Sequence, residues 1–318
     1  MLASRSADSR RSPALPRSVL RLSRRDLTLL VLLTIAWGLN WPMMKIGVVA
    51  FPPLLFRVLG LAGGVLVLYA YMRLRKESVA IARKDWPAVL LLALPNVIIW
   101  QIVSVLALRL LPSGRAAILG YTMPIWSVLI GLWLYGERPL PRYWWGIGAA
   151  FAGTLLLLSS EFAKLAGSPL GTLLMLVAAA SWGWGTHLMR RHLTRVPTIA
   201  LTLWMLSAAV PVAGLGTIVF EASQWRMPTA REWIAILYNV FVALSFCHIV
   251  WFKLARQLPP AASGLSVMMI PVVGVFSAMW ILGEAPGWQD YAALVLILIA
   301  LGTVLLGRKP PAPATPEP

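Results

Sequence analysis

Long runs of apolar residues, separated by short polar segments, dominate this 318-residue chain. Each run is close to the ~20 residues that a helix needs to cross ~30 Å of hydrocarbon. Runs of this length exclude strands, and a chain in lipid must satisfy its backbone hydrogen bonds internally. The pattern therefore predicts an all-α integral membrane protein with ten transmembrane helices. The predicted spans are residues 27–48, 53–72, 87–109, 114–135, 140–160, 170–189, 198–220, 233–254, 261–282 and 290–307.

The landmarks of the first half return in the second half at an offset of 147 residues. The matched pairs are Arg109 with Arg256, Pro112 with Pro259, Pro124 with Pro271, Gly136-Glu137 with Gly283-Glu284, and Pro139 with Pro286. Such self-similarity indicates a duplicated structural unit. We predict two five-helix repeats, at 27–160 and 170–307, joined by an external linker at 161–169. Because five spans is an odd number, the second repeat is expected to be inverted relative to the first, as in many secondary transporters.

Composition and charge also favour lipid as the solvent. The chain is 59% apolar and 12% charged, whereas soluble domains are nearer half apolar and a quarter charged. The net charge of +17 would suit nucleic acid only if the basic residues shared one folded face. They lie in short loops instead: with the N-terminus inside, the inner segments hold 21 Lys and Arg residues and the outer segments hold six. This bias places both termini in the cytoplasm and argues against a nucleic-acid partner.

The two ends of the chain differ from the apolar runs. Residues 1–26 carry seven arginines and could be a disordered cytoplasmic tail, a twin-arginine-like signal or a transit peptide. No small-residue cleavage site follows the first apolar run, so we interpret this segment as a retained basic tail. The Pro-rich residues 308–318 are interpreted as a disordered C-terminal tail.

Several motifs carry a resemblance to a known family. They are Trp37-Gly38-Leu39-Asn40-Trp41, Pro52-Pro53-Leu54-Leu55-Phe56-Arg57, the two Gly-Glu-x-Pro joints at 136–139 and 283–286, and Ser181-Trp182-Gly183. On these residues the chain resembles the ten-helix exporters of the drug/metabolite transporter superfamily, which are built from two EamA-type repeats. The resemblance covers about residues 27–307. It implies a multi-pass protein of the bacterial inner membrane, a central cavity shared by the halves, no cofactor, and export of small metabolites such as amino acids.

Pro124 and Pro271 are the candidate gating residues. Each lies about ten residues into its predicted helix, hence ~15 Å deep at 1.5 Å per residue. A proline there removes one backbone hydrogen bond and tends to kink the helix. Membrane helices also tolerate proline without a functional cause, but the equivalence of these two in the repeats favours kinks that shape the cavity or its gates.

Aromatic and polar residues in the apolar runs are the candidate substrate-binding residues. Trp37, Asn40 and Trp41 share a helix face, and Trp182 matches Trp37 in the second repeat. In the third and eighth spans, Gln101 and His248 are equivalent positions, 147 residues apart. Polar groups facing lipid are costly, so these should face a partner or water; interhelical packing and hydrogen bonding are the alternative. The predicted set is Trp37, Asn40, Trp41, Trp100, Gln101, Tyr121, Trp182, His248, Trp251 and Met268.

Charged residues near the ends of the spans are assigned structural roles. Arg57 lies about five residues into the second span, from which its side chain could bind a substrate carboxylate. Snorkelling to the outer surface is cheap from that depth, so we expect an anchoring role. Glu137 and Glu284, beside Gly and Pro at helix ends, are expected to tie loops.

The first span contains no acidic residue between Leu27 and Met44, so a bound cation would lack a countercharge. The sequence therefore predicts a secondary exporter of small neutral or zwitterionic metabolites, such as amino acids, that works by alternating access. The alternative is an exporter of drugs or lipid-headgroup amphiphiles. An enzyme is disfavoured because the cores of the spans hold no carboxylate and no His/Asp cluster. Small residues four apart in the fifth span leave a monomer or a homodimer open.

Overall fold

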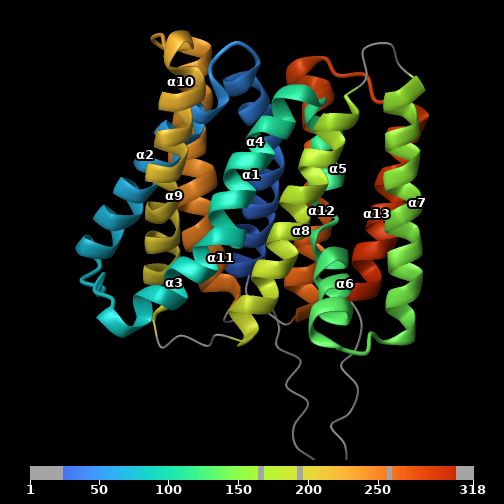
Figure 1. Ribbon diagram of the computed structural model, residues 1–318, viewed down its shortest axis with the longest axis horizontal. Coiled ribbons are helices and arrows are strands. Elements are labelled where there is room, and N and C mark those ends of the chain that lie inside the picture. Colours follow the sequence, from blue (N-terminus) through green and yellow to red (C-terminus); the bar gives the residue numbers. More distant parts are fainter. Residues whose placement is uncertain (1–23, 164–167, 192–195, 256–259, 306–318) are drawn as a thin grey trace, which may run out of the picture.

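The computed structural model describes residues 24–163, 168–191, 196–255 and 260–305, and every regular element in them is helical. The elements fall on the ten predicted apolar runs (Figure 1). In order they are α1 (Arg24–Val49), α2 (Pro53–Leu74), η1 (Arg83–Asp85), α3 (Trp86–Ala93), η2 (Leu94–Ile99), α4 (Trp100–Leu110), α5 (Ser113–Gly120), α6 (Met123–Tyr135), α7 (Pro141–Ala163), α8 (Pro169–Arg191), α9 (Thr198–Glu221), η3 (Ala222–Gln224), α10 (Ala230–Leu237), η4 (Tyr238–Phe246), α11 (Cys247–Ala255), α12 (Pro260–Leu282) and α13 (Trp288–Leu305). Nearly all of the predicted basic tail, residues 308–318 and linker residues 164–167 lie outside the described residues.

The described helices have the length and surface of a membrane protein. Seven helical stretches are long and apolar enough to cross a bilayer: Arg24–Val49, Pro53–Leu74, Arg83–Leu110, Ser113–Tyr135, Thr198–Gln224, Ala230–Trp251 and Trp288–Leu305. Val267–Leu282 is a shorter apolar helix. Large apolar side chains also cover the outside of the bundle, among them Leu66, Phe151, Phe220 and Trp280. A surface this apolar is suited to lipid rather than water.

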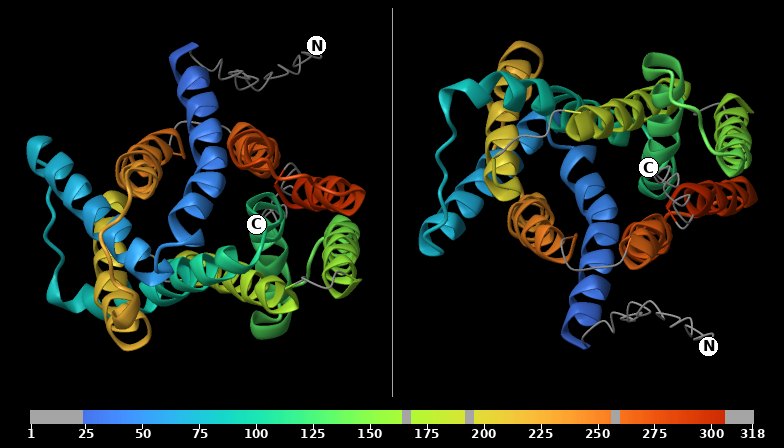
Figure 2. Two further views of the ribbon diagram at one scale, coloured as in Figure 1. Left: turned by 90° about the horizontal axis from the view of Figure 1, so that it is seen from above. Right: turned by 90° about the horizontal axis from the view of Figure 1, so that it is seen from below.

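The two repeats pack against each other through matching pairs of helices. α2 lies against α9 and α7 against α13, which joins each helix to its own counterpart (Figure 2). α1 packs on α12, and its counterpart α8 packs correspondingly on α5 and α6. The two Gly-Glu-x-Pro joints lie at opposite ends of the bundle (Figure 1). We call these the Glu137 end, formed by residues 136–140, and the Glu284 end, formed by residues 283–287.

Two equivalent glycines allow close helix contacts between the repeats. A Cβ at Gly38 would overlap the side chain of Val273 on α12. A Cβ at Gly183 would lie 2.7 Å from the backbone nitrogen of Ser127 on α6. Each glycine follows a tryptophan of the repeated motif, so the motif combines a close helix contact with an indole on the neighbouring face. This close approach requires the missing side chain.

The third and eighth spans contain π-helical segments at overlapping repeat positions, η2 and η4. Such segments leave backbone carbonyls without regular helical partners and are frequent at functional sites. Side chains of the opposite repeat bond these carbonyls: Ser181 Oγ donates to the Pro95 carbonyl at 3.2 Å, and Trp37 Nε1 donates to the Ala243 carbonyl at 3.4 Å. Pro95, which has no proline counterpart 147 residues later, lies in the first of these segments.

The candidate gating prolines differ in their local structure. The fourth span is interrupted between Gly120 and Met123, and Pro124 lies in the first turn of α6 after this break. Pro271 instead lies inside the uninterrupted helix α12. The fourth span is therefore broken next to its proline, whereas its counterpart in the second repeat is a continuous helix.

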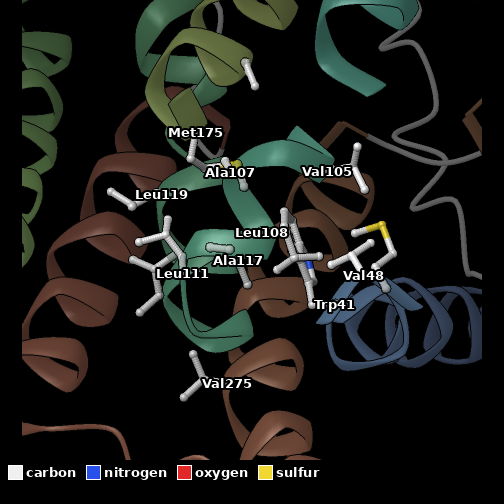
Figure 3. Close-up of a cluster of buried hydrophobic side chains, with 14 of the residues drawn as sticks. Trp41, Val48, Val105, Ala107, Leu108, Leu111, Ala117, Leu119, Met175 and Val275 are labelled. Atoms are coloured by element: carbon white, nitrogen blue, oxygen red, sulfur yellow. The ribbon is translucent and has the colours of Figure 1, made fainter. Parts of the chain in front are cut away.

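A large cluster of buried apolar side chains lies among helices of both repeats (Figure 3). Trp41 and Val48 of α1 meet Leu108 of α4, Ala117 of α5 and Val275 of α12 in this cluster. The cluster therefore joins both repeats, and its member Val275 packs beside Gly114, whose N–H binds the Glu284 carboxylate.

Candidate functional site

A cavity of about 240 Å³ lies between the two repeats. Its walls come from α1, α2, α4, α8, α11 and α12, with further residues from the break before α6 and from η4. Nine of the ten predicted substrate-binding residues line it: Trp37, Asn40, Trp41, Trp100, Gln101, Tyr121, Trp182, His248 and Trp251. Met268 is not part of this lining and packs at the edge of the main apolar cluster. The geometry thus brings most of the set together.

Aromatic rings form two walls of this cavity. The Trp37 ring lies 5.9 Å from those of both His248 and Trp251, edge-on to the histidine. The Trp100 and Trp182 rings lie 5.5 Å apart at 65°. The two walls are related by the duplication, since Trp37 and Trp182 are matching motif positions. Indole faces in such a wall attract apolar, aromatic and cationic groups.

Polar groups lie between these aromatic walls. Asn239 Nδ2 donates to Asn40 Oδ1 at 3.1 Å, and the ring nitrogen Nδ1 of His248 lies 3.1 Å from the Ala243 carbonyl. Within the described residues, the amide of Gln101 and the hydroxyl of Tyr121 form no hydrogen bond, although both side chains border the cavity. These groups are therefore available to a ligand.

Arg57 also lines the cavity, and the expectation that it snorkels to the outer surface is wrong. Its side chain is only 1% exposed. It lies in the second turn of α2 and reaches α1, where its Nη2 is 3.2 Å from the sulfur of Met44. The depth of a side chain along a helix follows from the sequence. The direction in which it leaves the helix axis depends on how the helix packs.

A wider vestibule of about 590 Å³ connects the cavity to the Glu137 end. The two spaces share Met123, Trp182, Trp251 and Val267 in their linings. Pro124 lies in the vestibule wall. The cavity is thus accessible from the Glu137 end, whereas the apolar cluster closes its other side.

Polar contacts between the repeats reinforce the closed end. The Glu284 carboxylate accepts hydrogen bonds from the Ser113 backbone N–H at 2.6 Å, the Ser113 hydroxyl at 2.9 Å and the Gly114 N–H at 3.0 Å, which caps α5. The guanidinium of Arg115 binds both oxygens of Asp290, at 2.7 and 3.0 Å. Within the first repeat, Lys45 Nζ donates to the carbonyls of Leu108, Arg109 and Leu111, at 2.7 to 3.1 Å. Glu284 therefore ties elements together, in line with the role expected for it.

Glu137, the counterpart of Glu284, is held more loosely. Its side chain is 49% exposed, and its Oε1 lies 3.5 Å from His187 Nδ1 and 3.6 Å from Arg191 Nη2. Exposed contacts of this kind contribute little to stability. The two equivalent joints therefore differ in strength in this conformation.

Nine of the 18 lining residues were not in the predicted set, and Asn239 and Arg57 carry the largest polar groups among them. Asn239, which is 1% exposed, lies nine residues before His248 and so on the same three-residue steps as His248 and Trp251, but it was not in the predicted set. Arg57 was noticed but placed elsewhere. Each residue had a signal in the sequence. Asn239 places an amide in an apolar run that also contains a histidine, and Arg57 places a charge inside a predicted span.

Comparison with known proteins gives matches over most of the chain. The model of the EamA-like transporter family matches twice, at residues 25–159 and 169–306. The uncharacterized transporter YvbV of Bacillus subtilis is 30% identical over 283 residues, covering 87% of this chain and 90% of the relative. A probable amino-acid metabolite efflux pump of Escherichia coli is 27% identical over 304 residues, covering 91% and 97%. A crystal structure with 24% identity superposes with a TM-score of 0.62 over 89% of this chain and 98% of that chain, a likeness that concerns the fold.

Proposed function

This chain belongs to the EamA-like transporter family, and we propose that it is a secondary active transporter that exports small neutral or zwitterionic metabolites, amino acids or related compounds, by alternating access. It is a multi-pass protein of the bacterial inner membrane. In the proposed arrangement, ten helices form two inverted repeats with both termini in the cytoplasm. The Glu137 end is then the cytoplasmic end, and this conformation is open to the cytoplasm.

The cavity between the repeats is the observation that carries the proposal. It lies at the meeting of two copies of one unit, it opens to one end, and polar contacts across the repeats close the other end. Sites of this kind, between repeats and near the membrane midplane, are typical of secondary transporters. Exchange of the open and closed ends would carry a solute across without opening a continuous channel.

The lining favours a small solute without net positive charge. Among the described residues that border the cavity there is no Asp or Glu, so a cation would meet no countercharge. The volume of about 240 Å³ is below the roughly 300–1,000 Å³ of sites for drug-sized ligands. Both features support a metabolite over a large amphiphile, and a relative named as a probable amino-acid metabolite efflux pump agrees with this class.

Transport into liposomes tests the proposal. The full chain, purified and reconstituted, should exchange at least one radiolabelled amino acid, nucleoside or aromatic metabolite loaded on the opposite side, and empty liposomes give the background. If none of these solutes exchanges while a lipophilic dye does, the amphiphile exporter is the better assignment. If neither exchanges, the proposed function loses its support.

A further inference from the structure

The guanidinium of Arg57 is the most unusual group in the cavity. It is the only charged side chain in the lining that the structure describes, and it is almost completely buried. Of the 20 buried polar or charged residues among those described, it is also one of the few with a nitrogen that lacks a partner. Burial of a charge is costly unless the charge is paired.

The contacts of Arg57 do not neutralise its charge. Nη2 lies 3.2 Å from the sulfur of Met44, a weak acceptor. Nε has no hydrogen-bond partner. The ring of the neighbouring Phe56 lies 5.9 Å from Cζ, at the outer limit of a cation–π contact. Within the described residues, no carboxylate forms an ion pair with Arg57.

Comparison with Arg115 shows how the same chain treats a buried arginine with a structural role. Arg115 is also buried, and Asp290 binds it with two short hydrogen bonds. Arg57 lies in a cavity and has no such partner, although a structural arginine is normally retained with one. An unpaired ionisable group within a membrane-spanning helix indicates a functional site.

The remaining cavity surface suits the rest of an organic acid. The indole rings of Trp100, Trp182 and Trp251 provide apolar faces on the side of the vestibule. The unbonded groups of Gln101 and Tyr121 border the same cavity and can donate hydrogen bonds. The lining thus combines a carboxylate-binding fork with aromatic walls.

We propose that Arg57 binds the carboxylate of the transported solute, so that the substrates are small monocarboxylates with an apolar or aromatic body. This assignment rests on the proposed transport function and adds the chemical group by which the site would recognise the solute. A guanidinium offers two parallel N–H groups that match a carboxylate, and such charged hydrogen bonds are about twice as strong as neutral ones. Both amino acids and simple carboxylic acids carry the required group.

Ligand binding to the purified full chain in detergent tests the assignment, with the fluorescence of the cavity tryptophans as the signal. L-phenylalanine and 3-phenylpropionate are the carboxylate probes, and L-phenylalaninamide and phenethylamine lack the carboxylate. The wild-type protein should bind at least one of the two acids and neither of the other probes at comparable concentration. Binding of 3-phenylpropionate as well as phenylalanine shows that the ammonium group is dispensable, whereas binding of phenylalanine alone limits the class to amino acids.

Variants of Arg57 locate the binding group. Arg57→Gln should weaken binding of the acids roughly 10- to 100-fold, the effect expected from losing hydrogen bonds to a charged group, and Arg57→Lys should give an intermediate loss. Arg109→Gln is the matched control, because Arg109 is exposed at the end of α4, and it should bind as the wild type does. If Arg57→Gln does not fold, the proposal is tested by comparing how tightly the wild-type protein binds the acid and the amide.

Three results would overturn the proposal: equal affinity of the wild type for phenylalanine and its amide, unchanged affinity of Arg57→Gln for the acids, or no binding of either acid. Failure of the transport function has a different signature. In that case the acids bind in detergent with the expected dependence on Arg57, but reconstituted liposomes exchange no solute. If the liposomes exchange the acid and the amide equally well, the carboxylate assignment is wrong, but the proposed transport function stands.

Discussion

Glu284→Gln should release the closed end of the cavity. In the present conformation the carboxylate caps α5 through three hydrogen bonds that cross from one repeat to the other. A glutamine side chain keeps one accepting oxygen and replaces the other with a donor, so part of the cap is lost. Loss of a helix cap costs about 1 kcal/mol, and loss of a negative charge at a helix N-terminus costs up to about 1 kcal/mol more. A total of about 2 kcal/mol is roughly a 30-fold shift toward opening.

Cysteine labelling measures this shift. Val275 is 1% exposed and packs beside Gly114 at the closed end, so a thiol in Val275→Cys reacts only when that end opens. Cys247, the single native cysteine, is first replaced by Ala. The rate of modification by a membrane-impermeant maleimide should rise roughly 30-fold in Glu284→Gln.

The repeat supplies the matched control for this experiment. Glu137→Gln alters the equivalent joint, where the carboxylate is half exposed and its charged neighbours are at least 3.5 Å away. Labelling at position 275 should then stay within a few-fold of the parent protein, since exposed ion pairs contribute about 0–1 kcal/mol. Equal labelling of Glu284→Gln and its parent would refute the reasoning, as would a larger effect of Glu137→Gln.

Three other substitutions test packing, charge pairing and the aromatic wall. Gly183→Ala should lower the free energy of unfolding by about 1–3 kcal/mol, because its Cβ would meet the α6 backbone; thermal unfolding in detergent measures this, and Gly148→Ala, with open space around it, should be near neutral. Arg115→Gln leaves a buried carboxylate without its cation and should cost about 3–5 kcal/mol in the same assay; an unchanged melting temperature would contradict the structural role. Trp182→Ala should raise the KM for transport about tenfold by removing one aromatic wall, whereas Trp145→Ala, on an indole that is 80% exposed, should leave KM unchanged.

The pattern of apolar and polar residues was sufficient to predict the apolar helices and nine of the residues that line the cavity. Runs of about 20 apolar residues are helices in lipid for a reason that is local to each run. An aromatic or polar stripe at three- and four-residue steps marks the face of such a helix that avoids lipid, which explains why Trp37, Asn40 and Gln101 lie together. That these residues bind a substrate stays a prediction.

The features that the sequence did not reveal depend on contacts between helices. Arg57 lies at a depth from which it could reach the surface, yet its side chain is 1% exposed and lines the cavity. Met268 lies 147 residues after Tyr121, and this equivalence in the repeats was the reason to predict it beside Tyr121 in the lining. The fourth span is broken just after Gly120 while α12 is continuous, so equivalent positions in the two repeats no longer face the same way.

The unequal shapes of the two repeats follow from small differences in sequence at equivalent positions. Ser113 and Gly114 give Glu284 two backbone N–H donors and a hydroxyl. Their equivalents, Pro260 and Ala261, offer a single backbone N–H and no hydroxyl, because proline has no N–H group. In the proposed alternating cycle, Glu137 would therefore cap the start of α12 with fewer hydrogen bonds than Glu284 forms with α5. Closure of the Glu284 end is then the stronger of the two closures, and a protein at rest would keep its cavity open toward the Glu137 end.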